Sequence, residues 1–225
     1  MPFLSKKKLS IFCCLALVFT LYEVWLHTIH TVIPNQVYRA AQLSPALLGH
    51  YIKTHHIKAV INLRGARPSA TWYQQEVAVT EQMGAHHYDL NLASKRLPST
   101  ENMRALVYIL LHAPKPLLVH CLGGADRSGL ASAIALILDK NTTLAQSETQ
   151  ISVLHLVLSP ISIGKLVFPY YQSWLSTNHL PHNRANFLQW VCAKQPFNAQ
   201  STDINNNAPS SYNPCSPITL TTGDI

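Results

Sequence analysis

A cysteine and an arginine that lie six residues apart form the segment of this chain with the clearest chemical potential. Cys121 follows a short apolar run at residues 117–119, and Arg127 precedes a longer apolar run at residues 130–138. The first run has the pattern of a buried strand and the second has the length of a helix. A loop between a strand and a helix start directs backbone N–H groups inward, and the helix dipole adds partial positive charge. The segment therefore predicts a phosphate-binding loop.

Cys121 is the predicted nucleophile of this loop. A free cysteine has a pKa of about 8.5, and a helix N-terminus beside a cation lowers that pKa by several units, so that a reactive thiolate forms. Arg127 is expected to donate two N–H bonds to phosphate oxygens, and Ser128 to donate a hydrogen bond to the departing sulfur. The other residues expected to bind phosphate are Leu122, Gly123, Gly124 and Ala125. The glycines let the backbone approach a ligand closely.

The loop resembles the signature of the cysteine-dependent protein tyrosine and dual-specificity phosphatases. It shares with them the order His120, Cys121, five further residues, Arg127 and Ser128. Residues 38–42 (Tyr-Arg-Ala-Ala-Gln) and 61–65 (Ile-Asn-Leu-Arg-Gly) also resemble the bacterial dual-specificity class, and the resemblance covers roughly residues 34–180.

This resemblance implies a hydrolase that cleaves phosphomonoesters through a phosphocysteine intermediate. The implied substrates are proteins phosphorylated on tyrosine, serine or threonine, or phosphoinositides. No metal or organic cofactor is expected, because the loop itself supplies the positive charge. Some lipid-directed relatives carry a lysine where this chain has Ala125, which counts against a purely phosphoinositide specificity.

Two aspartates are candidates for the general acid that protonates the leaving group. Asp126 lies inside the loop, directly before Arg127, as in some bacterial phosphatases that the chain resembles. Asp89 lies 32 residues before Cys121, a spacing similar to that of the mobile-loop aspartate of dual-specificity enzymes. Asp89 falls within an expected strand at residues 85–92, however, so Asp126 is preferred. Either aspartate could instead have a purely structural role.

Two other functions stay open at this point. One is a catalytically inactive phosphate-binding module with the same fold, which would follow if Asp126 were structural. The other is a thiol-based transfer enzyme, such as a sulfurtransferase or an arsenate reductase, although the active loops of those enzymes have other spacings.

The elements that must position this loop alternate between strands and helices, which indicates an α/β fold. Strands are expected near residues 37–39, 57–63, 85–92 and 117–119, and helices near residues 45–55, 69–84, 98–112, 130–138, 142–158, 164–177 and 183–194. We expect a phosphatase-like, mostly parallel central sheet with helices on both faces. It would form a single catalytic domain at residues 34–196.

The N-terminal segment has the layout of a signal peptide or a signal anchor. Three lysines at residues 6–8 precede an uncharged apolar run at residues 9–22, and no small-x-small cleavage site follows. We therefore expect residues 1–33 to form a single-pass membrane anchor and a linker. The lysines favour the cytoplasmic side, which would place the catalytic domain across the membrane, but the sequence does not fix this sidedness.

Composition narrows the remaining functions. The formal net charge is +7, without the interleaved basic and aromatic residues of a nucleic-acid binder, so no nucleic-acid partner is expected. The histidines do not have the spacing of a metal site. The five cysteines, at positions 13, 14, 121, 192 and 215, predict neither a zinc site nor a disulfide framework. Residues 197–225 are rich in Asn, Ser, Thr and Pro and predict a disordered tail.

Overall fold

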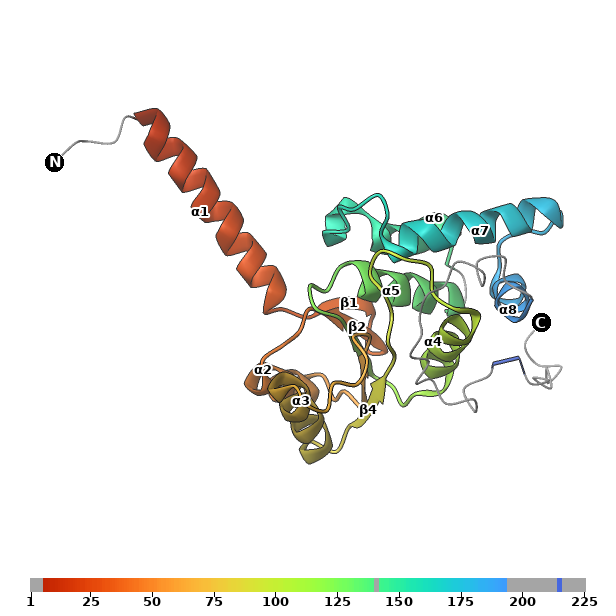
Figure 1. The fold of residues 1–225 in the computed structure, drawn as a ribbon, viewed down its shortest axis with the longest axis horizontal. Coiled ribbons are helices and arrows are strands. Elements are labelled where there is room, and N and C mark those ends of the chain that lie inside the picture. The colour runs from red at the N-terminus through yellow and green to blue at the C-terminus, as the bar shows by residue number, and fades with distance from the viewer. Residues whose placement is uncertain (1–5, 140–141, 194–213, 216–225) are drawn as a thin grey trace.

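The computed structural model describes residues 6–139, 142–193 and 214–215. A five-stranded sheet in the order β1-β2-β5-β3-β4 forms the centre of the molecule (Figure 1). The strands are β1 (His30–Ile33), β2 (Val37–Ala40), β3 (Ala59–Asn62), β4 (His86–Asp89) and β5 (Leu117–His120). All neighbouring pairs are parallel except β1 and β2, which are antiparallel. The predicted mostly parallel sheet is therefore confirmed.

Helices cover both faces of the sheet, as predicted. Because side chains of a strand alternate between faces, Val60 packs into one apolar cluster and Ile61 into the other. The smaller cluster lies under α2 (Pro45–Thr54) and α3 (Thr71–Gln82). The larger cluster is covered by α4 (Thr100–His112), α5 (Asp126–Leu138), α7 (Ile163–Thr177) and α8 (Arg184–Cys192). Both clusters consist of apolar side chains. The polar groups of the candidate site therefore lie at the ends of the strands and in the loops that follow them.

Local signals place the helix starts correctly. Ser44 caps α2 by accepting a hydrogen bond from the N–H of Leu47, and Pro45 occupies the first helical position. Ser99 caps α4 in the same way by accepting from the N–H of Asn102. Such caps contribute about 1 kcal/mol each to stability.

The predicted helix at residues 142–158 is wrong beyond its first turn. The structure has a short α6 (Leu144–Glu148), followed by the 3-10 turns η1 (Thr149–Ile151) and η2 (Val153–His155). The carbonyl oxygen of Gln150 accepts a hydrogen bond from a buried arginine of β2, Arg39, at 3.0 Å. Leu156 then takes a left-handed conformation with φ of 58°. The hydrogen bond between Arg39 and Gln150, which are 111 residues apart, thus ends the helix that the local sequence pattern would continue to residue 158.

Two further features were not predicted. Strand β1 lies in the segment that the sequence assigns to the anchor and linker, yet it pairs with β2 in the sheet. Cys192 and Cys215 form a disulfide across a sequence separation of 23 residues, so the expectation of no disulfide is wrong. Sequence spacing alone does not show which cysteines a fold brings together. Apart from residues 214–215, the predicted disordered tail lies outside the described residues.

The N-terminal helix α1 (Lys6–Leu26) extends away from the sheet (Figure 1). It has 21 residues, none of them buried. In the part of the chain that the structure describes, it is the one helix long and apolar enough to cross a membrane, a property that it shares with signal sequences.

Candidate active site

Cys121 lies where β5 ends, and α5 begins five residues later at Asp126. This is the carboxyl end of the parallel strands, the edge at which open α/β sheets bind their ligands. The sulfur lies 3.6 Å from the hydroxyl of Ser128 and accepts hydrogen bonds from the backbone N–H groups of Ser128 and Ala125. The predicted loop therefore exists as a cradle of amides around one buried sulfur.

The electrostatics of this cradle favour a thiolate. Burial by itself raises the pKa of the Cys121 thiol. The guanidinium of Arg127 and the hydrogen bonds from Ser128 and Ala125 outweigh burial, so the pKa lies below its ordinary value. A sulfur in this setting is a better nucleophile near neutral pH than a free cysteine.

Arg127 keeps most of its donors available. Among the described residues, its Nη1 makes two long contacts, at 3.4 Å, with the carbonyl oxygens of Leu63 and Leu92. Its Nε is buried and has no hydrogen-bond partner among the described residues. A guanidinium with unused N–H groups near a thiolate is suited to a doubly charged oxyanion such as phosphate.

Arg39 is a second arginine of the site, and sequence reasoning missed its role. Its side chain is fully buried. Nη2 donates to the carbonyl oxygens of Gly124 at 2.7 Å and Ala125 at 3.1 Å, while Nη1 donates to the backbone and side chain of Gln150. Burial first of all lowers the pKa of Arg39 to about 10, so the group stays charged at neutral pH.

The hydrogen bonds that Arg39 donates to the loop carbonyls explain why backbone N–H groups of the loop point toward the sulfur of Cys121. In a trans peptide the C=O and the N–H point in opposite directions. Since Arg39 holds the carbonyl of Gly124 on the outer side, the N–H of Ala125 points to the sulfur. Gly124 also needs to be glycine, because its φ is 63° and a Cβ there would lie 2.6 Å from the backbone nitrogen of Ala41. The sequence signals for Arg39 were a charged residue within a buried strand and its place in the 38–42 segment that resembles the bacterial class.

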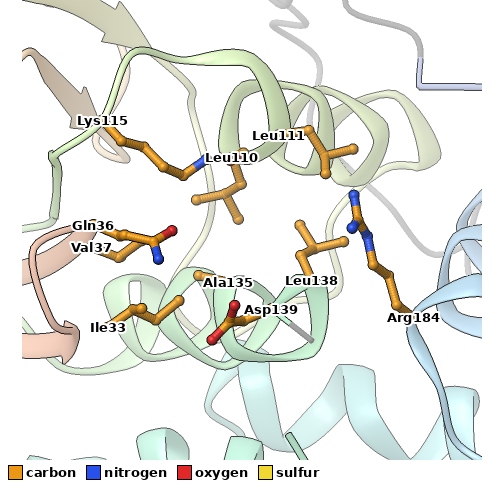
Figure 2. Close-up of a pocket in the computed structure, with 10 residues that line it drawn as sticks. All are labelled: Ile33, Gln36, Val37, Leu110, Leu111, Lys115, Ala135, Leu138, Asp139 and Arg184. Carbon is orange, nitrogen blue, oxygen red and sulfur yellow. Dashed lines mark hydrogen bonds between the residues drawn. The ribbon is translucent and has the colours of Figure 1, made fainter. Parts of the chain in front are cut away.

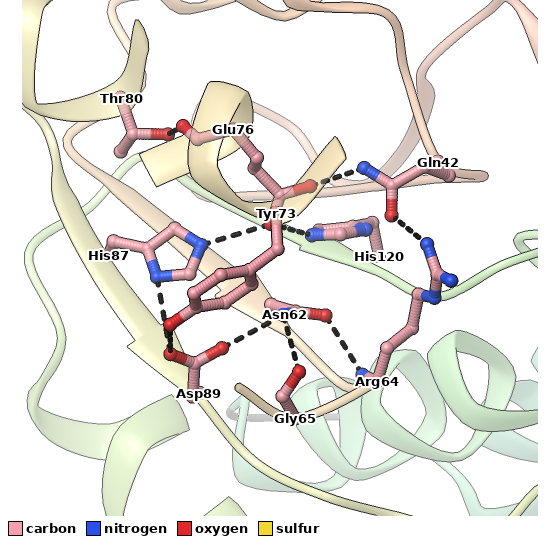
Figure 3. Close-up of polar contacts among 10 residues, drawn as sticks. All are labelled: Gln42, Asn62, Arg64, Gly65, Tyr73, Glu76, Thr80, His87, Asp89 and His120. Carbon is pink, nitrogen blue, oxygen red and sulfur yellow. Dashed lines mark hydrogen bonds and ion pairs between the residues drawn. The ribbon is translucent and has the colours of Figure 1, made fainter. Parts of the chain in front are cut away.

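A polar network supports the loop from the side of α3 (Figure 3). Glu76, on α3, accepts hydrogen bonds from His120 at 3.0 Å and from His87 at 2.9 Å, and its other oxygen is bonded to Gln42. Burial raises the pKa of Glu76, but His120 and these hydrogen bonds lower it much further, well below its ordinary value. His120, directly before Cys121, is thereby tied to a buried carboxylate.

Asp89, one of the two predicted general acids, belongs to this same network. Its carboxylate accepts from the hydroxyl of Tyr73 at 2.5 Å and from Nδ2 of Asn62 at 2.8 Å, and it lies 3.6 Å from Nδ1 of His87. Figure 3 shows these groups around the end of β4. Both oxygens of Asp89 are therefore engaged.

Asp126, the other predicted acid, has a different setting. It is the first residue of α5 and is partly exposed, and its carboxylate makes no hydrogen bond or ion pair within the described part of the chain. Of the other loop residues, Gly123 has open space around it, and the side chain of Leu122 is exposed. Of the two aspartates, only Asp126 belongs to the loop that holds the sulfur.

A separate pocket of about 300 Å³ lies near the opposite ends of β2 and β5 (Figure 2). Lys115, Asp139 and Arg184 line it together with apolar side chains. Lys115 donates to the carbonyl oxygen of Leu110 at 3.0 Å. The pocket does not include Cys121 or its loop.

No group of three His, Cys, Asp or Glu side chains suited to a metal ion occurs among the residues that the structure describes.

Solved structures of phosphatases have a fold similar to that of this chain. The catalytic core of the PP-IP phosphatase SIW14 from S. cerevisiae is 18% identical, with a TM-score of 0.50 over 69% of this chain and 95% of that one. A putative phosphatase (DUF442) from Shewanella putrefaciens CN-32 is 23% identical, with a TM-score of 0.43 over 54% of this chain and 78% of that one. No curated protein sequence matches the chain.

A family model, that of the tyrosine phosphatase family, matches residues 26–140. Since this match spans just over half of the sequence, and the fold is that of the cysteine-based phosphatases, the chain belongs to the tyrosine phosphatase family.

Proposed function

We propose that this protein is an active phosphomonoesterase with Cys121 as its nucleophile. The thiolate attacks phosphorus, the bond between phosphorus and the ester oxygen breaks, and a phosphocysteine forms. Asp126 gives its proton to the leaving alcohol or phenol. Water then attacks the phosphocysteine and gives a proton to Asp126, and breakage of the S–P bond releases inorganic phosphate and the thiolate.

The observation that carries this proposal is the cradle around the sulfur. Amides of Ala125 and Ser128 already point at Cys121, and the free N–H groups of Arg127 lie on the same loop. In the transition state these groups would face the equatorial phosphate oxygens, where negative charge is concentrated. Preorganised donors of this kind contribute about 10²–10³ each to the rate in related oxyanion sites.

The choice of Asp126 as the acid follows from the partners of the two aspartates. The hydroxyl of Tyr73 and the amide of Asn62 each donate a hydrogen bond to one oxygen of Asp89 at the end of β4, so both of its oxygens are occupied. Asp126 is unpaired among the described residues and lies beside Arg127 on the loop itself. A proton donor has to reach the leaving oxygen, and the loop position supports Asp126 in that role.

We further propose that the substrate is a phosphoprotein or a phosphoinositide, and that α1 anchors the enzyme in a membrane. The length and apolar surface of α1 support anchoring, and the three lysines at its start favour the cytoplasmic side. The disulfide between Cys192 and Cys215 supports a catalytic domain on the opposite, oxidising side of the membrane.

The test is hydrolysis of an aryl phosphate by the full chain in detergent, with and without a metal chelator. We expect chelator-insensitive turnover that Cys121→Ser abolishes, while Cys13→Ser, at an exposed cysteine of α1, retains it. Phosphopeptides and phosphoinositides compared under the same conditions then define the substrate class. Phosphate binding without turnover of any of these substrates would instead identify an inactive phosphate-binding module.

A further inference from the structure

The segment between α6 and α7 exposes an unusual group of apolar side chains. Val153, Leu154, Leu158 and Ile161 are 63%, 78%, 70% and 52% exposed, and we call residues 152–161 the apolar loop. From residue 149 to residue 164 the chain contains no Asp, Glu, Lys or Arg. Gathered apolar side chains on a surface mark a contact with a protein or a membrane.

The apolar loop is a folded structure. Val157 is fully buried, its N–H donates to the carbonyl oxygen of Ser152 at 3.2 Å, and its carbonyl oxygen accepts from Nζ of Lys165 at 2.8 Å. Leu154 and Leu158, on either side of this buried valine, point outward. The fold therefore presents these leucines on a fixed surface.

The apolar loop is continuous with the end of α1. The ring of Trp25, near the last residue of α1, lies 6.0 Å from the ring of His155 and stacks on His30 at 3.8 Å. Figure 1 shows the apolar loop, in cyan at the end of α6, on the side of the domain from which α1 extends. Tryptophan favours the interface between a membrane and water, so Trp25 marks the level at which a spanning α1 would leave the bilayer.

The one titratable group of the apolar loop does not oppose contact with lipid. Burial lowers the pKa of His155 to about 4, and the nearby Arg39 and His30 lower it in the same direction. His155 is therefore neutral at pH 7. The nearest flanking charges, Glu148 and Lys165, lie outside the uncharged stretch.

We infer that the apolar loop is a second membrane-contact surface, which inserts Leu154 and Leu158 into the interface of the bilayer that α1 spans. This inference rests on the proposed anchoring by α1. Contact at two places would fix the orientation of the domain, whereas a single helix would leave it free to rotate. Gln150, two residues before the apolar loop, is bonded to Arg39, which holds the phosphate loop. The contact would therefore hold the active site close to the membrane surface.

The experiment measures lipid contact at single positions of the full chain in phosphatidylcholine–phosphatidylglycerol vesicles. A fluorescent amino acid replaces Leu154, or Leu15 in the middle of α1, or Met83 at the end of α3. Met83 is the matched control, because it is an exposed apolar residue far along the chain from both surfaces. Nitroxides attached at shallow or deep positions of the lipid acyl chains quench nearby fluorophores. Hydrolysis of aryl phosphate by each labelled protein confirms that it is folded.

We expect quenching by deep nitroxides at position 15, quenching by shallow nitroxides at position 154, and no loss of fluorescence at position 83. A label at Leu158 should repeat the result for position 154. Quenching at position 15 combined with no quenching at positions 154 and 158 would overturn this inference and leave the anchor intact. It would also point to a protein as the occupant of the apolar loop. No quenching at position 15 would overturn both the anchor and the inference.

Discussion

At the scale of single residues, the proposed reactivity of Cys121 would depend on two arginines with different tasks. Arg127 lowers the pKa of the thiol and keeps N–H groups available for phosphate. Arg39 is a positioning residue: it is buried behind the loop and bonds to two of its carbonyl oxygens. The sulfur is thus stabilised both by a charge and by the direction of the peptide groups.

Replacing Arg39 by lysine keeps the charge but removes the fork of donors. A lysine cannot reach both Gln150 and the carbonyls of Gly124 and Ala125, so buried acceptors lose their partners at a cost of about 1–3 kcal/mol each. We expect a lower free energy of unfolding and a higher pKa of Cys121, because the Ala125 amide is no longer fixed. Denaturant unfolding and the pH dependence of thiol alkylation measure these two effects. Arg184→Lys, at an exposed position on α8, is the control and should change neither the free energy of unfolding nor the pKa of Cys121. An unchanged pKa of Cys121 in Arg39→Lys would contradict the positioning role of Arg39.

Replacing Ser128 by alanine tests the hydrogen bond to the sulfur. The hydroxyl lies 3.6 Å from the sulfur and lowers the pKa of Cys121, so its removal should raise that pKa. The midpoint of inactivation by iodoacetamide should therefore move to higher pH. Ser132→Ala is the matched control, since Ser132 is also buried on α5 and its hydroxyl has no partner among the described residues. Equal midpoints for the two variants would exclude this role of Ser128.

At the scale of elements, α3 is joined to β4 and β5 through one buried carboxylate. Glu76 bonds to His87 of β4 and to His120 of β5, and the strand that ends in His120 leads directly into Cys121. The position of α3 on the sheet thereby influences where the phosphate loop begins. Asp89 adds a second junction between the same helix and β4 through Tyr73.

Replacing Glu76 by glutamine should weaken this junction in a pH-dependent way. The pKa of Glu76 in the folded state lies below its ordinary value of 4.5, so the ionised group stabilises the fold above that pH. This contribution declines as the pH falls below 4.5 toward the folded-state pKa. We expect Glu76→Gln to lower the free energy of unfolding at pH 7 by about 1–3 kcal/mol, and the difference from the wild type to narrow in acid. Urea unfolding at several pH values measures this difference in the free energy of unfolding. Glu81→Gln, at an exposed position on the same helix, is the control. A pH-independent difference would contradict this account.

The elements differ in how far the sequence alone predicted them. The starts of α2 and α4 and the strand before Cys121 depend on neighbouring residues, so local patterns predicted helices near residues 45–55 and 98–112 and a strand near residues 117–119. The early end of α6 depends on the contact between Arg39 and Gln150, which are 111 residues apart. Arg39 also belongs to the site through equally long-range bonds, to the carbonyl oxygens of Gly124 and Ala125. Strand β1 was assigned to the linker although its β-branched residues 31–33 (Thr-Val-Ile) favour a strand, and its pairing with β2 defines it.

At the scale of the whole molecule, an apolar helix, a disulfide and an exposed apolar loop occur on one chain. In the proposed arrangement the helix and the apolar loop would hold the domain at a membrane, and the disulfide would suit an oxidising compartment. Burial keeps the sulfur of Cys121 away from solvent, since that residue is only 3% exposed.

The disulfide provides a test at this scale. Closing a loop of this length contributes about 2–4 kcal/mol in the chain-entropy account. We expect Cys215→Ser to lower the midpoint of thermal unfolding, and reducing agent to lower it for the wild type but not for the variant. Thiol-reactive polyethylene glycol should fail to label Cys192 and Cys215 in the protein taken from cells without reduction. Labelling of both cysteines before reduction would contradict a domain in an oxidising compartment.

The most direct test of the central claim is to trap the phosphocysteine. With an aryl phosphate that has a good leaving group, Asp126→Asn should still form the intermediate but hydrolyse it slowly, because the residue no longer accepts a proton from water. Rapid denaturation at alkaline pH, where the S–P bond is stable, and peptide mass spectrometry should then find one phosphoryl group on Cys121, and Asp89→Asn should show no such accumulation. Continued turnover with no phosphoryl group on Cys121, or with the group on another residue, would contradict the account.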